Sequence, residues 1–488
     1  MKRLYLLATG LLFAACSDFL EVVPKDKQTQ EQLFATKGGF YTAANGIYDA
    51  LATNALYGQK LSYEMIDLLG KRHTVIAANT YFNSLNAYTY GNTPVAAALE
   101  GAWSTAYRLA LNCNVLIDNI DKQVGLLTAV EADILRGEML ATRALLHLDM
   151  LRLFGPIYQD DPSAVSIPYN ELSTIAALPL LPADTVIGRV IRDLKAAGGL
   201  LAGKDPVIEN GPLASEEPGE SVNLRYRQLR LNYYAVLALE ARACLYAGDK
   251  VNALAAAKRV LNDPAVQGHF PPVDPNRLLA NQVNPDRVFS TEVLFGIYRK
   301  DRATIYTRYF DSENAGNNFL HPHTAFVEGR LFSGETQDYR FQSQWQQATG
   351  VGVSGHVFTK FKAIARPDAN DPDSEYFYAT LMSLIRLQEL YYIAAESEPD
   401  LADGYAWLNE ARARRGVPVQ AVVSEADLLT RLRLEYLREF TGEGQAFFLY
   451  KRLGSTIASA ENGSGTSTVA VVVADRVPPM PVSEIENR

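Results

Sequence analysis

The stretch that decides the fold runs in four pieces: RLQELYYIAAE at 386–396, LNEARARRG at 408–416, LEYLREFTGEG at 434–444 and YKRLG at 450–454. Apolar side chains recur at helical spacing in the first piece, as expected for one buried face of a helix. The members of this face are Leu384, Leu387, Tyr391 and Ala394. A second face follows at Leu429, Leu432, Tyr436 and Phe440. The stretch therefore predicts three or four consecutive helices.

The same stretch carries signals for where its helices begin and end. Ser424, with Asp427 three residues later, predicts a capping-box start, and Gly416 predicts a helix stop. Charges of opposite sign three residues apart can pair along a helix surface. We expect two such pairs: Arg386 with Glu389, and Glu435 with Arg438.

Two earlier segments have the pattern of paired helices. Apolar residues recur at helical spacing over 99–120, and Trp103 is among them, so we expect Trp103 in the core. The next helix, over about 130–154, is apolar on nearly every face and is expected to be buried. Small residues in 229–263 and a Gly-Asp turn at 248–249 are typical of a tetratricopeptide hairpin, because its two helices approach closely.

These segments resemble the SusD/RagB family of nutrient-binding surface lipoproteins of Bacteroidetes-type outer membranes. Besides the stretch quoted first, the resemblance rests on RAL at 143–145, FGP at 154–156, LYAGD at 245–249, DYR at 338–340 and PPMP at 478–481. The order and spacing of the family's motifs are kept. The chain departs from their usual residues at Gln388, Tyr436, Phe440 and Leu453.

The resemblance implies a mainly α fold, in which tetratricopeptide-like helical hairpins form a scaffold. Residues 37–488 are then one SusD-like domain. Residues 264–380, which are rich in Pro, Asn, Gly and Asp, are expected to form an irregular insertion with short strands at 292–298 and 357–362.

The N-terminus has the pattern of an export signal. Lys2 and Arg3 precede an apolar run that is too short to span a bilayer and ends FAAC at 13–16. We predict a signal peptide at 1–15, lipidation of Cys16, and a tether over 16–36. The alternative is a plain secretory signal in which the cysteine is incidental.

The net charge and the cysteine count limit the kinds of binding partner and of covalent cross-link that we expect. The formal net charge of the 488-residue chain is -9, which argues against nucleic acid or anionic lipid as the main partner. Besides Cys16 there are only Cys113 and Cys244, both in apolar helical patterns, so two buried free thiols are favoured over a disulfide.

Aromatic residues gather in two irregular segments, and such long loops are usually functional or disordered. Sugar rings stack on aromatic side chains through their apolar faces, and their hydroxyl groups bind amides, carboxylates and guanidinium groups. The first cluster of candidate ligand contacts is Asp67, Arg72, Tyr81, Phe82, Asn83, Asn86 and Tyr88. The second is Tyr306, Tyr309 and Phe310, with Asn317 and Asn318 nearby. For any single ring, packing of the loop onto the scaffold is an equally weighted alternative.

Other motifs favour ordinary structural roles. Gly350, Gly352 and Gly355 have dinucleotide-motif spacing but lack the strand before and the helix after, so no cofactor is predicted. The two histidines of HPH at 321–323 have no recognisable third metal ligand nearby. Glu435, Glu439 and Glu443 are four apart, but the flanking Arg431, Arg433 and Arg438 favour ion pairs over acid–base catalysis.

The resemblance therefore implies a non-catalytic protein, lipid-anchored in the outer membrane and facing the cell exterior. It would bind an oligosaccharide and pass it to a SusC-like TonB-dependent transporter. Two alternatives remain: a peptide-binding member of the same family, and a periplasmic helical-repeat scaffold that binds only protein.

Overall fold

The computed structural model describes residues 29–212, 222–279, 284–322, 326–348, 355–365, 370, 376–454, 457–458, 468–469 and 473–486. The predicted signal peptide, Cys16 and most of the tether lie outside these ranges. So do Gly350, Gly352 and His323.

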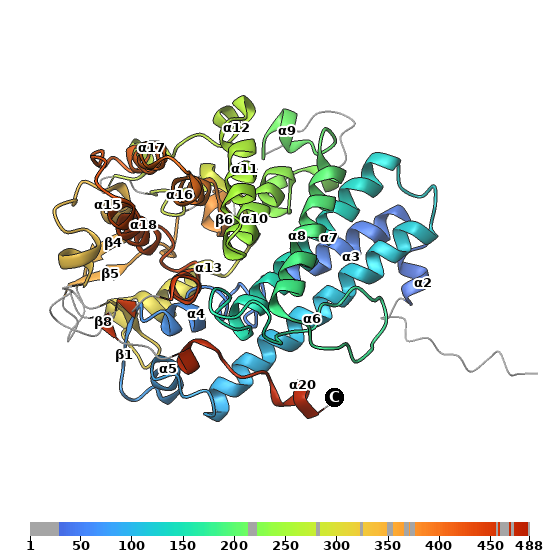
Figure 1. Cartoon of the computed structure of the whole chain (residues 1–488), viewed down its shortest axis with the longest axis horizontal. Helices are drawn as coiled ribbons and strands as arrows, with labels where there is room; N and C mark the ends of the chain where they lie inside the picture. The colour runs from blue at the N-terminus through green and yellow to red at the C-terminus, as the bar shows by residue number, and fades with distance from the viewer. Residues whose placement is uncertain are drawn as a thin grey trace, which may run out of the picture.

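The fold is a succession of helices, each packed against the next. They are α3 (Lys37–Leu51), α6 (Thr93–Lys122), α7 (Ala129–Phe154), α8 (Ala183–Leu201), α10 (Tyr233–Tyr246), α11 (Lys250–Leu261), α16 (Leu387–Ser397), α17 (Leu401–Ala413), α18 (Glu425–Glu439) and α19 (Ala446–Leu453). Contacts run from α6 to α7 and α8, then through α10 and α11 to α16 and α17. Figure 1 shows α3 and α6–α8 on one side, α10 and α11 in the middle, and α16–α18 on the other side. The predicted mainly α, tetratricopeptide-like scaffold is confirmed.

Helix α7 is enclosed by its neighbours along most of its length. Thr128 and Glu131 form a reciprocal capping box at its start, so its first backbone N–H groups are satisfied locally. Almost every residue from Ile134 to its end is buried or half-buried, as the sequence predicts. Trp103 of the neighbouring α6 is also buried, at 3% exposure.

The helical stretch begins later than the sequence predicts. Residues 381–386 form strand β6 (Leu381–Arg386), antiparallel to β2 (Val293–Tyr298), and α16 starts at Leu387. The placement of Leu384 on a helical face is therefore wrong. The apolar residues of LMSLIR fall in two adjacent pairs, so spacing alone does not separate a strand from a helix there. The strand depends on a partner almost ninety residues earlier in the chain.

The predicted local ion pair between Arg386 and Glu389 is also wrong. Arg386 is fully buried and pairs with Glu439 and Glu443, while Glu389 pairs with Arg242 of α10 at 2.6 Å. Because β6 places Arg386 before the helix begins, its side chain crosses the core to α18 instead of following a helix surface.

The predicted pair of Glu435 and Arg438 is confirmed at 3.0 Å. The glutamates of this segment take ion-pair roles, as the sequence favours. Their partners differ in part: Glu439 binds Arg340, Arg386 and Arg415, and Glu443 binds Lys360 and Arg386. Arg431 pairs instead with Asp427 at 2.6 Å.

This buried network joins the insertion to the scaffold. Arg340 belongs to α15 (Tyr339–Gln344) in the insertion, and it contacts Glu435 at 2.7 Å and Glu439 at 2.9 Å in α18. Arg415, just after α17, contacts Glu439 at 2.7 Å and Glu292 at 2.6 Å. These five charged side chains, from four separate segments, thus pair with one another around α18, away from solvent.

The predicted helix boundaries in this region hold in part. The Ser424 hydroxyl accepts from the Asp427 backbone N–H at 3.2 Å, which is one half of a capping box. Helix α17 ends at Ala413, and Gly416 follows with a φ of 69°. Only a glycine adopts this conformation without strain, so Gly416 marks the turn that follows the helix.

The insertion contains short elements. The predicted strand at 292–298 is β2, and the one at 357–362 is the shorter β5 (His356–Phe358), which pairs with β4 (Trp345–Gln347). Cys113 and Cys244 are buried free thiols, as predicted. Within the described ranges, no helix combines the length and the apolar character needed to cross a membrane.

Candidate functional site

The two predicted aromatic clusters lie side by side. Strand β1 (Thr74–Val75) of the first segment pairs antiparallel with β3 (Leu320–His321) of the second. The Asn79 side-chain amide also donates to the backbone oxygen of Asn317 at 2.8 Å and to Oδ1 of Asn318 at 3.2 Å. Residues about 240 positions apart in the chain thus form one continuous region, which we call the loop surface: residues 59–88 and 302–321.

The first segment is more regular than the sequence predicts. It contains α4 (Met65–Leu69) and α5 (Thr80–Asn86) in place of a single irregular loop. Asn79 starts α5, because its side-chain oxygen accepts from the Phe82 backbone N–H at 3.0 Å. The same side chain therefore fixes both the helix start and, through its amide, the second segment.

Rings from the two segments pack on one another. Tyr309, in the π-helix η5 (Tyr306–Phe310), lies 5.3 Å from Tyr63 and 6.5 Å from Phe82 between ring centroids. Its hydroxyl accepts from the Gln59 side-chain amide at 2.9 Å. These contacts hold the two segments in a fixed relative position.

Glu64 organises the polar part of the loop surface. Its carboxylate is almost fully buried and forms an ion pair with Lys60. It also accepts from the Tyr81 hydroxyl at 3.0 Å, and that hydroxyl accepts from Lys60 Nζ at 2.9 Å. Burial, together with the negative charge of Glu64, raises the pKa of Tyr81. The phenol of Tyr81 therefore stays protonated and acts only as a hydrogen-bonding group.

Six of the ten predicted contact residues are buried. They are Asp67, Arg72, Phe82, Asn86, Tyr309 and Phe310. Asp67 accepts from the Gly442 backbone N–H at 2.8 Å, and Arg72 donates to the Leu437 backbone oxygen at 3.1 Å. These side chains hold the loops against α18 and the turn after it. Burial of Phe82, Tyr309 and Phe310 corresponds to the packing alternative stated for individual rings.

The remaining predicted residues reach the surface in part. They are Tyr81, Asn83, Tyr88 and Tyr306. Tyr306 lies beneath Lys362, whose Nζ is 5.8 Å from the ring centroid. Tyr88 has a φ of 55°, and its hydroxyl donates to the Leu69 backbone oxygen at 2.9 Å. A ligand contact by any of these residues remains a prediction.

Sequence reasoning missed Gln59, Lys60, Glu64 and Asn79. The first three precede the aromatic run, and none is aromatic, so a search for rings passes over them. Lys60 and Glu64 are four residues apart, a spacing at which opposite charges pair on a helix. This spacing is the sequence pattern that could have identified the pair.

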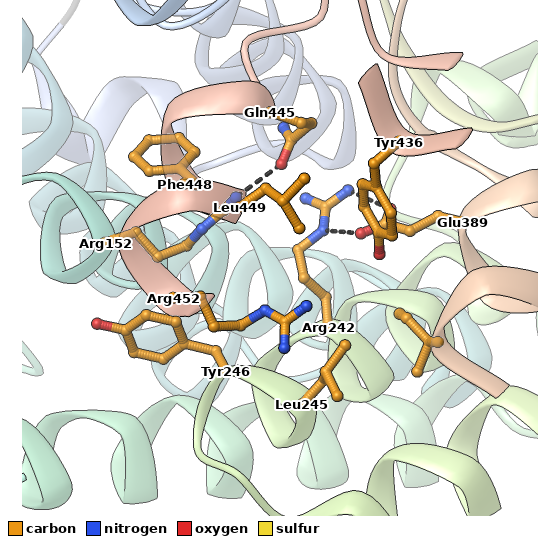
Figure 2. Close-up of a pocket in the computed structure, with 11 residues that line it drawn as sticks. Arg152, Arg242, Leu245, Tyr246, Glu389, Tyr436, Gln445, Phe448, Leu449 and Arg452 are labelled. Carbon is orange, nitrogen blue, oxygen red and sulfur yellow. Dashed lines mark hydrogen bonds and ion pairs between the residues drawn. The ribbon is translucent and has the colours of Figure 1, made fainter. Parts of the chain in front are cut away.

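A second candidate region contains several charged side chains but encloses only a small cavity. Arg152, Arg242 and Arg452 surround a cavity of about 40 Å³. Figure 2 shows Arg152 reaching Gln445 and Arg242 reaching Glu389, and these contacts measure 2.6 Å each. Small-molecule sites typically have volumes of about 300–1,000 Å³. This cavity is too small for a sugar. Its ion pairs join α10 to α16, through Arg242 and Glu389, and α19 to α16, through Arg452 and Glu396.

In the part of the chain that the structure describes, no group of three or more His, Cys, Asp or Glu side chains is placed to hold a metal ion. The loop surface instead offers partly exposed phenol rings beside amide, ammonium and carboxylate groups. This combination suits a polar ligand that has apolar ring faces.

Comparisons with known proteins agree with the fold. No family model matches the chain. The SusD-like protein P25 of Formosa agariphila is 26% identical over 204 residues, which span 40% of this chain and 37% of that protein. The match therefore covers well under half of that relative's length.

Solved structures match over most of the chain. A SusD-like carbohydrate-binding protein from Bacteroides vulgatus superposes with a TM-score of 0.65 at 23% identity, covering 87% of this chain and 85% of the other. Surface glycan-binding protein A from Bacteroides thetaiotaomicron gives a TM-score of 0.65 at 16% identity, covering 93% and 98%. The fold is that of the SusD-like proteins, as the resemblance of the sequence implies.

Proposed function

We propose that this protein binds an oligosaccharide on the loop surface and delivers it, chemically unchanged, to a partner TonB-dependent outer-membrane transporter. The observation that carries the proposal is the joining of the two aromatic segments into one surface, where Tyr81 and Tyr306 are partly exposed. Two proteins of the same fold are described as carbohydrate-binding or glycan-binding, which supports the class of ligand.

The chemistry of the surface also supports a saccharide. Each sugar ring that covers a phenol ring would contribute on the order of 1–2 kcal/mol from buried apolar area. Asn83 is on the same short helix as Tyr81, and Asn318 is bonded to Asn79 at the start of that helix. Both carry amide groups of the kind that bind hydroxyls. Because Glu64 and Lys60 fix the Tyr81 hydroxyl, its ring is held in place before the ligand arrives.

The cellular setting is part of the proposal. Lipidation of Cys16 would anchor the chain in the outer membrane, since several acyl chains at about 0.8 kcal/mol per buried CH₂ give a durable attachment. The transporter would then lie next to the bound ligand. Mass spectrometry of the mature protein from cells tests the anchor: acyl groups on Cys16 support it, and an unmodified cysteine contradicts it.

Array binding tests the ligand class. Wild-type protein is applied to glycan and peptide arrays, together with Tyr81→Ala, Tyr306→Ala and the control Tyr226→Ala. Tyr226 is 54% exposed and stacks on Phe377 outside the loop surface. We expect glycan binding that each loop-surface variant weakens about tenfold and the control leaves unchanged. Binding to peptides alone would favour the peptide-binding alternative, and binding to neither array would contradict the proposal.

A further inference from the structure

A cavity of about 430 Å³ opens where the short π-helix η7 (Val327–Leu331), α18 and α19 meet. Its volume is within the range of small-molecule sites. The residues that line it are Arg330, Asp427, Thr430, Arg431, Arg433, Leu434, Leu437 and Tyr450. Three guanidinium groups thus face one carboxylate, in a chain whose formal net charge is -9. The excess of positive charge is local to this cavity.

Two of these arginines have no acidic partner among the described residues. Asp427 is neutralised by Arg431, at 2.6 Å. Arg330 and Arg433 form no ion pair with any residue that the structure describes, and Nε of Arg433 is buried without a hydrogen-bond partner. By contrast, Arg340 and Arg415, which are buried nearby, are matched with carboxylates. The unmatched guanidinium groups therefore favour an anion from outside the chain.

Arg72 adds a third incompletely paired guanidinium beside the cavity. It is 1% exposed, and its Nη2 donates to the backbone oxygen of Leu437, a lining residue. Its Nε and Nη1 have no hydrogen-bond partner within the described chain. Burial lowers the pKa of Arg72, Tyr450 and Asp67 oppose this, and Arg330 lowers it further. Arg72 therefore lies within electrostatic reach of two residues that line the cavity.

Residues of the loop surface pack against residues that line the cavity, as Arg72 does against Leu437. Arg72 follows α4 in the same segment as Lys60 and Glu64, and His73, its neighbour, packs 5.8 Å from Phe310 of the second segment. The Arg72 guanidinium also lies 4.9 Å from the ring of Phe326, next to η7. The segment that contains Arg72 and His73 thus packs both against the second segment of the loop surface and beside η7, which carries Arg330.

We propose that this cavity is an anion-binding subsite that recognises an oxyanion group, a carboxylate or a sulfate, on the saccharide ligand. Guanidinium groups bind such planar or tetrahedral oxyanions through paired N–H donors. The inference rests on the proposed function and makes it more specific: the ligand is an acidic oligosaccharide, and Arg330 and Arg433 hold its charge while phenol rings cover its sugar faces.

Matched saccharide pairs test the inference by isothermal titration calorimetry. One pair is an oligogalacturonate and its carboxyl-reduced form; the other is a sulfated galactan oligosaccharide and its desulfated form. We expect at least one acidic member to bind about tenfold more tightly than its neutral counterpart. The pair that shows this preference tells carboxylate from sulfate. The preference should shrink as sodium chloride is raised, because salt screens charge.

Arginine variants localise the effect. Arg330→Gln and Arg433→Gln should each reduce binding of the acidic member about fivefold or more, and leave the neutral member unchanged. Arg259→Gln, on α11 and 50% exposed, is the charge-matched control and should alter neither. Circular dichroism establishes that each variant is folded.

The outcomes separate the two proposals. If both members of each pair bind equally and the arginine variants match wild type, the anion subsite is refuted while saccharide binding stands. If neither these probes nor a broad glycan array gives binding, the proposed function and the subsite both fail.

Discussion

Replacing Glu439 with glutamine tests whether the buried network holds the insertion to the scaffold. Glu439 is fully buried and accepts from Arg415 at 2.7 and 2.9 Å, from Arg340 at 2.9 Å, and from Arg386. Burial raises the pKa of Glu439, but these three guanidinium groups lower it well below its usual range. The side chain is therefore a carboxylate in the folded protein.

The magnitude follows from what the substitution leaves behind. Glutamine has the same shape but no charge, so three buried guanidinium groups lose a shared partner. Each keeps at least one other carboxylate: Arg340 keeps Asp338 and Glu435, Arg386 keeps Glu443 and Arg415 keeps Glu292. Breaking a buried ion pair by removing one partner typically costs about 3–5 kcal/mol. We expect the free energy of unfolding of Glu439→Gln to fall within that range.

Urea unfolding, followed by tryptophan fluorescence and circular dichroism, measures this loss. Asp121→Asn is the matched control, because Asp121 is 62% exposed and pairs with Arg136 at the surface. Exposed pairs contribute at most about 1 kcal/mol. A loss in Glu439→Gln that is no larger than in Asp121→Asn would refute the reasoning, since the network would then add nothing to the attachment of the insertion.

Three further predictions concern pH and backbone geometry. Burial raises the pKa of Glu435, but three arginines lower it to about 2. The stability that the Glu435 carboxylate contributes is therefore present above the ordinary pKa of 4.5 and is lost as the pH falls towards 2. Urea midpoints measured against pH in wild type and Glu435→Gln would reveal this loss. Burial lowers the pKa of His147 to about 4, so stability should fall as the pH drops from 6.5 to 4, and His147→Gln should flatten this part of the profile. Gly416→Ala should cost about 1–3 kcal/mol in urea unfolding, because a Cβ there would lie 2.5 Å from the Tyr339 ring at a φ of 69°.

The helical scaffold was predictable because its signals are local. Apolar patterns identified α6 and α7, and small residues with the Gly-Asp turn at 248–249 identified the hairpin of α10 and α11. These features depend on residues within one or two turns of each other, so a single sequence displays them.

The errors at the start of α16 have the opposite origin. Whether 381–386 is strand or helix depends on β2, and the partner of Arg386 depends on where α18 packs. Neither is visible in the local pattern. Tertiary pairing therefore overrode both the helical spacing of Leu384 and the expected pair of Arg386 with Glu389.

For the candidate site, the sequence identified the two segments but not the role of each residue. Tyr81 and Phe82 are adjacent and both aromatic, yet one is partly exposed and the other buried. On a short helix, adjacent side chains point in different directions, so which ring faces solvent depends on how α5 docks onto Tyr309. Composition alone carries no such information.

The most direct test of the account is a crystal structure with bound oligosaccharide, using the glycan that binds most tightly on the array. The account predicts a sugar ring within van der Waals contact of Tyr81 or Tyr306, on the surface formed by 59–88 and 302–321. A ligand bound on the scaffold helices, away from both segments, would contradict it.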